Sequence, residues 1–121
     1  MDTIVIVAAG VFFFGMGVYA LAAPAALVRP FGLTATAPES RSEVRAVYGG
    51  FGLAIATLLG LSAAGLGGLR PGAVLAVAAA LAGMALGRVV SRVVDAPTAF
   101  YPVWFYCVVE TVAAAALFAV A

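Results

Sequence analysis

Apolar residues fill four long stretches of the chain, and short segments rich in proline, glycine, serine and charged residues separate them. Each stretch has about 20 residues, the length that an α-helix needs to cross the hydrocarbon core of a bilayer. The pattern predicts helices over residues 3–23, 41–66, 73–94 and 99–121. We therefore expect one all-α domain, residues 1–121, that forms an integral membrane four-helix bundle with antiparallel up-down topology.

Turn-forming residues mark the predicted breaks between these helices. Ser40 and Glu43 have the S-x-x-E spacing of a capping box, which predicts that the second helix begins near Arg41. Glycine and proline residues between positions 67 and 72 end that helix. The first helix is expected to be retained rather than cleaved as a signal peptide, because an acidic residue, Asp2, follows Met1 where a signal peptide has basic residues.

The composition excludes several classes of function. Hydrophobic residues make up 66% of the chain and charged residues 9%, the net charge is +1, and no polybasic segment is present, so nucleic acid is not an expected partner. Histidine is absent, which removes the commonest metal ligand and general base. Cys107 is the only cysteine and is interpreted as a small packing residue. We expect no catalytic residue, no metal and no cofactor, and a non-enzymatic protein.

The arginines predict the orientation of the helices. Antiparallel helices place five of the six basic residues at one end of the bundle, and only Arg70 at the other. The five are Arg29, Arg41, Arg45, Arg88 and Arg92. By the positive-inside rule the arginine-rich end is cytoplasmic, so both termini are expected outside the cytoplasm.

Small residues recur every four positions on the second and third predicted helices. The stripes are Ala46, Gly50 and Ala54, then Ala56, Gly60 and Ala64, then Ala79, Gly83 and Gly87. Such stripes let helix backbones approach closely in lipid. We interpret them as seams between helices of one chain, with a dimerisation face as the alternative.

Two charged residues are predicted to lie inside the hydrophobic region. Arg88 precedes Asp95 by seven residues, or about 10 Å along a helix, and Glu110 follows Phe100 by ten residues, or about 15 Å. Unpaired charges at such depths are costly. Because the last two helices are antiparallel, Arg88 and Glu110 are predicted to form a direct ion pair. Arg92 lies one turn nearer the surface, with Asp95 and Glu43 as candidate partners.

The polar residues around this pair define a candidate site. Small and polar faces of three helices are predicted to converge on a polar core that opens toward the cytoplasm. The candidate binding residues are Arg45, Tyr48, Arg88, Ser91, Arg92 and Glu110. A structural pair that fixes helix register and a ligand, proton or ion site both remain open. The aromatic residues of segment 100–106 fit an interfacial belt, with a lid over a pocket as the alternative.

Two segments resemble a known family. Residues 42–53 read SEVRAVYGGFGL, and residues 87–97 read GRVVSRVVDAP. With Glu110, these segments resemble a bacterial family of small four-helix membrane proteins catalogued as domain of unknown function 4345. The resemblance covers nearly the whole chain and implies a bacterial inner membrane, but it implies no activity. Ala96 stands where family members often have glycine.

Three functions remain open from the sequence, of which a membrane enzyme is the least supported because the chain has no histidine, no lysine and no recognisable catalytic motif. The first is an accessory or scaffold protein that packs through its small-residue faces against a second copy or a larger membrane complex. The second is a carrier, channel or receptor-like protein that binds a lipid or amphipathic anion at the polar core. Membrane lipids are expected partners in both cases.

Overall fold

The computed structural model describes residues 2–121, and every regular element in that range is helical. The elements are α1 (Asp2–Ala22), α2 (Pro24–Val28), the 3-10 turn η1 (Arg29–Phe31), α3 (Pro38–Val44), the π-helical η2 (Arg45–Gly50), α4 (Phe51–Ala63), the 3-10 turn η3 (Leu66–Gly68), α5 (Arg70–Val94), the π-helical η4 (Phe100–Trp104) and α6 (Phe105–Val120). Several of these elements join end to end, so the chain has few long helices.

Four helices within residues 2–121 are long and apolar enough to cross a membrane. They are Asp2–Ala22, Pro38–Ala63, Arg70–Val94 and Phe100–Val120. The second combines α3, η2 and α4, and the fourth combines η4 and α6. Their lengths and composition are those of a multi-pass membrane protein.

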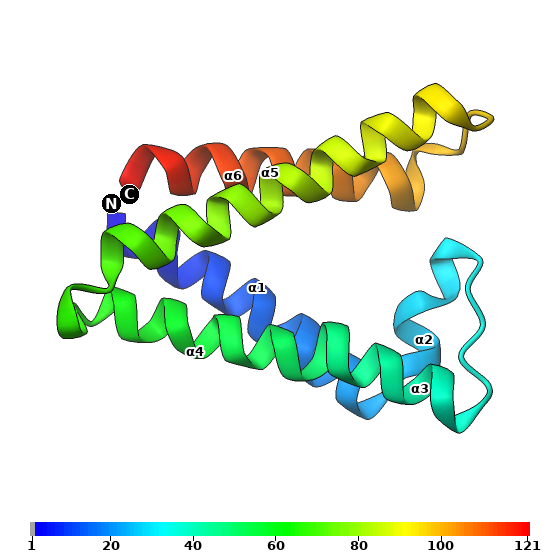
Figure 1. The fold of residues 1–121 in the computed structure, drawn as a ribbon, viewed down its shortest axis with the longest axis horizontal. Coiled ribbons are helices and arrows are strands. Elements are labelled where there is room, and N and C mark those ends of the chain that lie inside the picture. The colour runs from blue at the N-terminus through cyan, green and yellow to red at the C-terminus, as the bar shows by residue number, and fades with distance from the viewer. Residues whose placement is uncertain (1) are drawn as a thin grey trace.

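The long helices are arranged as two pairs (Figure 1). Helix α1 packs most extensively on α4, and α5 packs most extensively on α6. The two termini lie together at one end of the molecule, next to the turn that joins α4 to α5. The ribbons of the two pairs diverge toward the opposite end, where the chain passes from α1 to α3 and from α5 to α6.

The seam between α1 and α4 is built on glycine. The buried residues of α1 alternate at spacings of four and three, the period of closely packed antiparallel or parallel helices: Ile6, Gly10, Phe13, Gly17 and Ala20. A Cβ atom added to Gly17 would lie 2.9 Å from the backbone oxygen of Gly49 and 2.9 Å from the backbone nitrogen of Leu53. The absence of a side chain at Gly17 therefore sets how closely the two backbones approach.

A shared apolar core joins the two pairs near the termini. It contains Ile6 and Phe13 of α1, Leu59 of α4, and buried residues of α5 and α6 such as Val74 and Leu117. A second, smaller cluster contains Ala20, Val28, Ala35 and Val44, all from the first half of the chain. The large core therefore holds the two helix pairs together at the end that carries the termini. The small cluster packs the connection between α1 and α3 against the α1–α4 pair.

The second long helix begins at Pro38, three residues before the predicted start. The capping-box prediction for Ser40 and Glu43 is wrong, because Ser40 lies inside the first turn and bonds backward. Its hydroxyl donates to the Ala37 carbonyl over 3.0 Å and accepts from the Ala37 N–H over 3.2 Å. Proline is compatible with the first helical turn because its missing N–H has no helical partner there, which explains the earlier start.

The third long helix also begins before its predicted start, at Arg70 rather than residue 73. Pro71 lies in its first turn, where proline is tolerated. The preceding turn depends on Gly65, Gly67 and Gly68, all of which have positive φ angles. Residues 24–31, predicted to be a connection, instead form the short elements α2 and η1.

The predicted small-residue seams within the chain are wrong for two of the stripes. Ala46, Gly50 and Ala54 are exposed, and so are Ala79, Gly83 and Gly87. A Cβ atom added to Gly83 or Gly87 would meet no atom within 4 Å. These stripes therefore point away from the rest of the chain, and glycines at other positions make the close helix contact.

Candidate functional site

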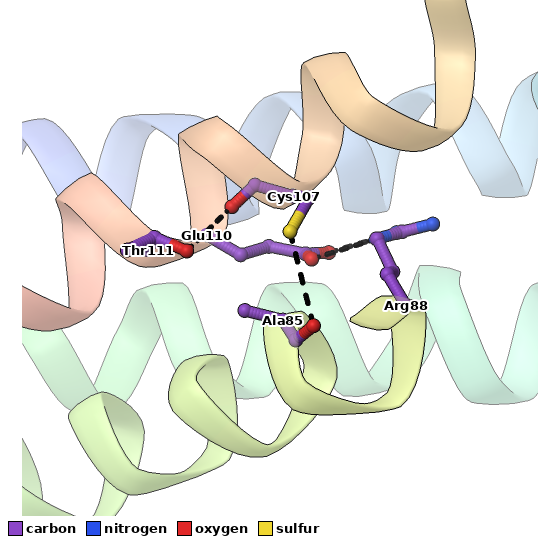
Figure 2. Close-up of polar contacts among 5 residues, drawn as sticks. All are labelled: Ala85, Arg88, Cys107, Glu110 and Thr111. Atoms are coloured by element: carbon purple, nitrogen blue, oxygen red, sulfur yellow. Dashed lines mark hydrogen bonds and ion pairs between the residues drawn. The ribbon is translucent and has the colours of Figure 1, made fainter. Parts of the chain in front are cut away.

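Arg88 of α5 and Glu110 of α6 form a bidentate ion pair (Figure 2). Arg88 Nε donates to Glu110 Oε1 over 2.7 Å, and Arg88 Nη2 donates to Glu110 Oε2 over 2.8 Å. The Glu110 side chain is 4% exposed and that of Arg88 is 22% exposed. This contact confirms the pair predicted from the sequence.

Helix periodicity places both residues on the α5–α6 seam. The buried residues of α6 are Cys107, Glu110, Ala114 and Leu117, spaced by three, four and three positions. Arg88 lies three residues after Ala85, the last buried residue of α5. The carboxylate therefore occupies a core position of α6, and Arg88 reaches it from the next turn of the facing helix.

Two neighbouring aromatic rings pack near the Arg88 guanidinium. Its central carbon lies 5.6 Å from the centroid of the Phe31 ring and 5.8 Å from that of Tyr106. The two rings are 5.6 Å apart. These distances are within the range of cation–π attraction. Phe31 belongs to η1, so this contact also joins the α1–α4 half of the chain to the α5–α6 half.

The geometry limits what the pair can do chemically. Both Glu110 oxygens accept hydrogen bonds from one guanidinium, an arrangement that holds the orientation of the carboxylate. Arginine has five N–H donors, and the pair uses one on Nε and one on Nη2. The Nη1 edge of Arg88 makes no hydrogen bond within residues 2–121, so it is the part of the site that can still bind an anion.

Two neighbours of the pair complete their hydrogen bonds with backbone carbonyls. The Cys107 thiol donates weakly to the Ala85 carbonyl, with sulfur and oxygen 3.8 Å apart, and Thr111 donates to the Cys107 carbonyl over 2.7 Å. Figure 2 shows both contacts beside the ion pair. Cys107 is buried, which agrees with its interpretation as a packing residue.

The structure places the other predicted site residues elsewhere. Arg45 donates from Nε to the Leu21 carbonyl over 3.1 Å. Leu21 lies at the C-terminal end of α1, where the helix dipole stabilises a positive charge. Tyr48, Ser91 and Arg92 are exposed, and their side chains make no hydrogen bond within residues 2–121. Of the six predicted residues, only Arg88 and Glu110 are in polar contact with each other.

The expected pairing of Arg92 is also not formed. Among residues 2–121, Arg88–Glu110 is the ion pair that the structure contains, so neither Asp95 nor Glu43 bonds to Arg92. The same range contains no group of three or more Cys, Asp or Glu side chains placed to hold a metal ion.

Phe31 is the site residue that sequence analysis missed. It lies in a segment without helical periodicity, between Pro30 and Gly32, and contacts residues more than 50 positions later in the chain. No local pattern indicates such a contact. The sequence places Tyr106 in an interfacial belt, and in the structure its ring also packs near the Arg88 guanidinium.

The comparisons with known proteins identify the family. A family model described as domain of unknown function (DUF4345) matches residues 1–121, the whole chain, and the chain belongs to this family. No curated protein matches the chain, and no solved structure matches it.

Proposed function

We propose that this member of the DUF4345 family is an inner-membrane protein, an antiparallel four-helix bundle that acts as a non-enzymatic accessory or scaffold protein. The observation that carries the proposal is the pairing of its buried carboxylate. Both oxygens of Glu110 are bonded to Arg88, and two aromatic rings pack near the guanidinium. Such a pair fixes the register of α5 on α6 and leaves the carboxylate no role as a general base.

The outward face of α5 supports the same role. Ala79, Gly83 and Gly87 are exposed at four-residue spacing, while the opposite face of α5 is buried in the core. In lipid, a second helix packs best where small residues admit its backbone. This face is therefore the proposed contact with a second copy or with a larger membrane complex.

Native mass spectrometry of the protein extracted with its own lipids tests the scaffold role. A partner chain or a second copy should accompany the wild type and be lost in the Gly83→Leu variant. Gly15→Leu is the matched control, because Gly15 of α1 also has open space around its Cβ position. If the Gly83→Leu variant keeps every partner of the wild type, the α5 face is not the contact and the proposal fails.

A second candidate function is binding of a lipid or amphipathic anion at the arginine-rich end. The observation that favours it is the free Nη1 edge of Arg88, whose side chain is partly exposed beside Phe31 and Tyr106. The test is the Arg88→Met, Glu110→Leu double variant. If that variant folds but loses a small amphipath that co-purifies with the wild type, the pair serves binding rather than register.

A further inference from the structure

Arg70 is a charged residue outside the site described above, and it is anchored at the end of the molecule that carries the termini. Its Nε donates to the Ser62 carbonyl over 3.3 Å, and its Nη2 donates to the Ala63 carbonyl over 3.2 Å and to Thr3 Oγ1 over 3.0 Å. The three acceptors are uncharged. The positive charge of Arg70 therefore has no carboxylate partner within residues 2–121, and its Nη1 edge is free.

The same guanidinium spans the gap between two helices. Thr3 lies in the first turn of α1, and Ala63 is the last residue of α4, so Arg70 bridges the ends of the α1–α4 pair. Figure 1 shows that the start of α5 lies at this end, beside both helices. A fixed arginine at the end of a membrane-spanning helix is well placed to meet a lipid headgroup.

An apolar groove lies between the same two helices. It has a volume of about 320 Å³ and is lined by seven residues: Val7, Gly10, Val11, Phe14, Ala56, Thr57 and Gly60. Gly60 keeps it open, since a Cβ atom added there would meet no atom within 4 Å, whereas a Cβ atom added to Gly10 would lie 3.6 Å from Leu59 Cβ. The walls are the exposed side chains of Val7, Val11 and Phe14.

Helix periodicity joins the groove to Arg70. Thr3, Val7 and Phe14 lie on one face of α1, at spacings of four and seven residues, and Ala63 lies one turn beyond Gly60. The groove therefore runs toward the point where Arg70 bonds to Thr3 and Ala63. From Thr3 to Phe14 the distance along the helix is about 16 Å, close to half of a hydrocarbon core of about 30 Å.

We propose that this groove and Arg70 together bind one phospholipid with an anionic headgroup, in the leaflet on the side of the termini. The headgroup phosphate bonds to the free Nη1 edge of Arg70, and one acyl chain lies along the groove over Gly10 and Gly60. The depth of one leaflet favours an acyl chain over a partner helix, which would require contact along the whole span. The unpaired charge favours an anionic lipid over a zwitterionic one.

The inference rests on the proposed membrane insertion but not on the scaffold role. Carbonate extraction of membranes tests insertion by itself, because an inserted protein stays in the pellet. Lipid retention by the detergent-purified protein then tests the groove, so failure of one does not imply failure of the other.

Native mass spectrometry with added dioleoyl phosphatidylglycerol or dioleoyl phosphatidylcholine measures the lipid retained per chain. We expect the wild type to retain about fivefold more phosphatidylglycerol than phosphatidylcholine, because one arginine near an anionic headgroup contributes about 1 kcal/mol. Arg70→Gln should abolish the preference and Arg70→Lys should keep it. Arg92→Gln, which removes an exposed arginine at the other end, is the matched control and should keep it.

The groove has its own variant. Gly60→Leu fills the groove from an open position and should lower retention of both lipids, whereas Ala115→Leu places a leucine at an exposed position of α6 and should leave retention per chain unchanged. Equal retention of the two lipids by the wild type overturns the proposal. So does an equal loss of preference in Arg70→Gln and Arg92→Gln, or identical behaviour of the two leucine variants.

Discussion

Gly17 of α1 and Gly52 of α4 lie back to back, with so little space that a Cβ atom added to Gly52 would stand 3.1 Å from the Cα atom of Gly17. The same added atom would lie 3.0 Å from the Phe13 carbonyl oxygen. Both neighbours are backbone atoms, which cannot move aside as a flexible side chain can. The contact therefore fixes the separation of α1 and α4.

Gly52→Ala should destabilise the protein by about 1–3 kcal/mol, the usual cost of overpacking a close contact. Thermal unfolding in detergent, followed by circular dichroism, measures the loss. Gly60→Ala is the control on the same helix, because its Cβ position is open, and it should unfold at or slightly above the wild-type temperature. Equal melting temperatures for the two variants would contradict the role of Gly52 in the seam.

Arg88→Met alone should destabilise the protein by roughly 3–5 kcal/mol, because it leaves the buried Glu110 carboxylate unpaired. Glu110→Leu alone should also destabilise it, but by less, because Arg88 is partly exposed. The double variant should recover much of the loss, since apolar side chains of similar size replace both charges. Thermal unfolding of the four proteins completes a double-mutant cycle. Arg92→Met is the control, one turn away and exposed, and should change little. Single losses that simply add in the double variant would show that the two residues are not coupled.

Phe31→Leu should destabilise the protein by about 0.5–1 kcal/mol, because it removes the ring that faces the Arg88 guanidinium. Phe31→Trp keeps an aromatic face and should retain most of the stability. The loss should shrink when Phe31→Leu is made in the Arg88→Met variant, where no cation remains. Unfolding temperatures that are the same for Leu and Trp at this position would assign the contact to packing alone.

Cysteine labelling in intact cells tests the orientation predicted from the arginines, in which the arginine-rich end is cytoplasmic. In a Cys107→Ser background, a cysteine in place of Thr34 should be protected from an impermeant thiol reagent, and one in place of Leu66 should react. Both positions are exposed and lie in connections at opposite ends of the molecule. The reverse labelling pattern overturns the arginine-based orientation.

The sequence predicts the Arg88–Glu110 pair because an unpaired charge inside a membrane is costly and few other charged residues lie at the same depth. Both residues lie deep in apolar stretches, and short connections bring the last two long helices side by side. Depth along each helix follows directly from residue counts. The same argument fails for Arg45, whose partner is a backbone carbonyl at the end of α1, and no charge pattern indicates such an acceptor.

The direction of each small-residue face is harder to predict. Two stripes with the expected four-residue spacing point outward, while Gly17, Gly49 and Gly52 make the close contact. In an apolar helix, all faces have similar hydropathy, so periodicity does not distinguish the buried face from the lipid-facing one. The alternating four-and-three spacing of the buried α1 residues was the available signal. Phe31 had none, since its contact depends on how a connection folds back over a distant helix.

The pairing of the long helices has a consequence for biosynthesis. Each pair consists of long helices that are consecutive along the chain, α1 with α4 and α5 with α6. The glycine contact between α1 and α4 lies entirely within residues 2–63. Arg88 and its partner Glu110 are only 22 residues apart in the chain. The ribosome can therefore deliver the protein as two helical hairpins. Each hairpin contains its own helix–helix contact, and the second contains both partners of the ion pair.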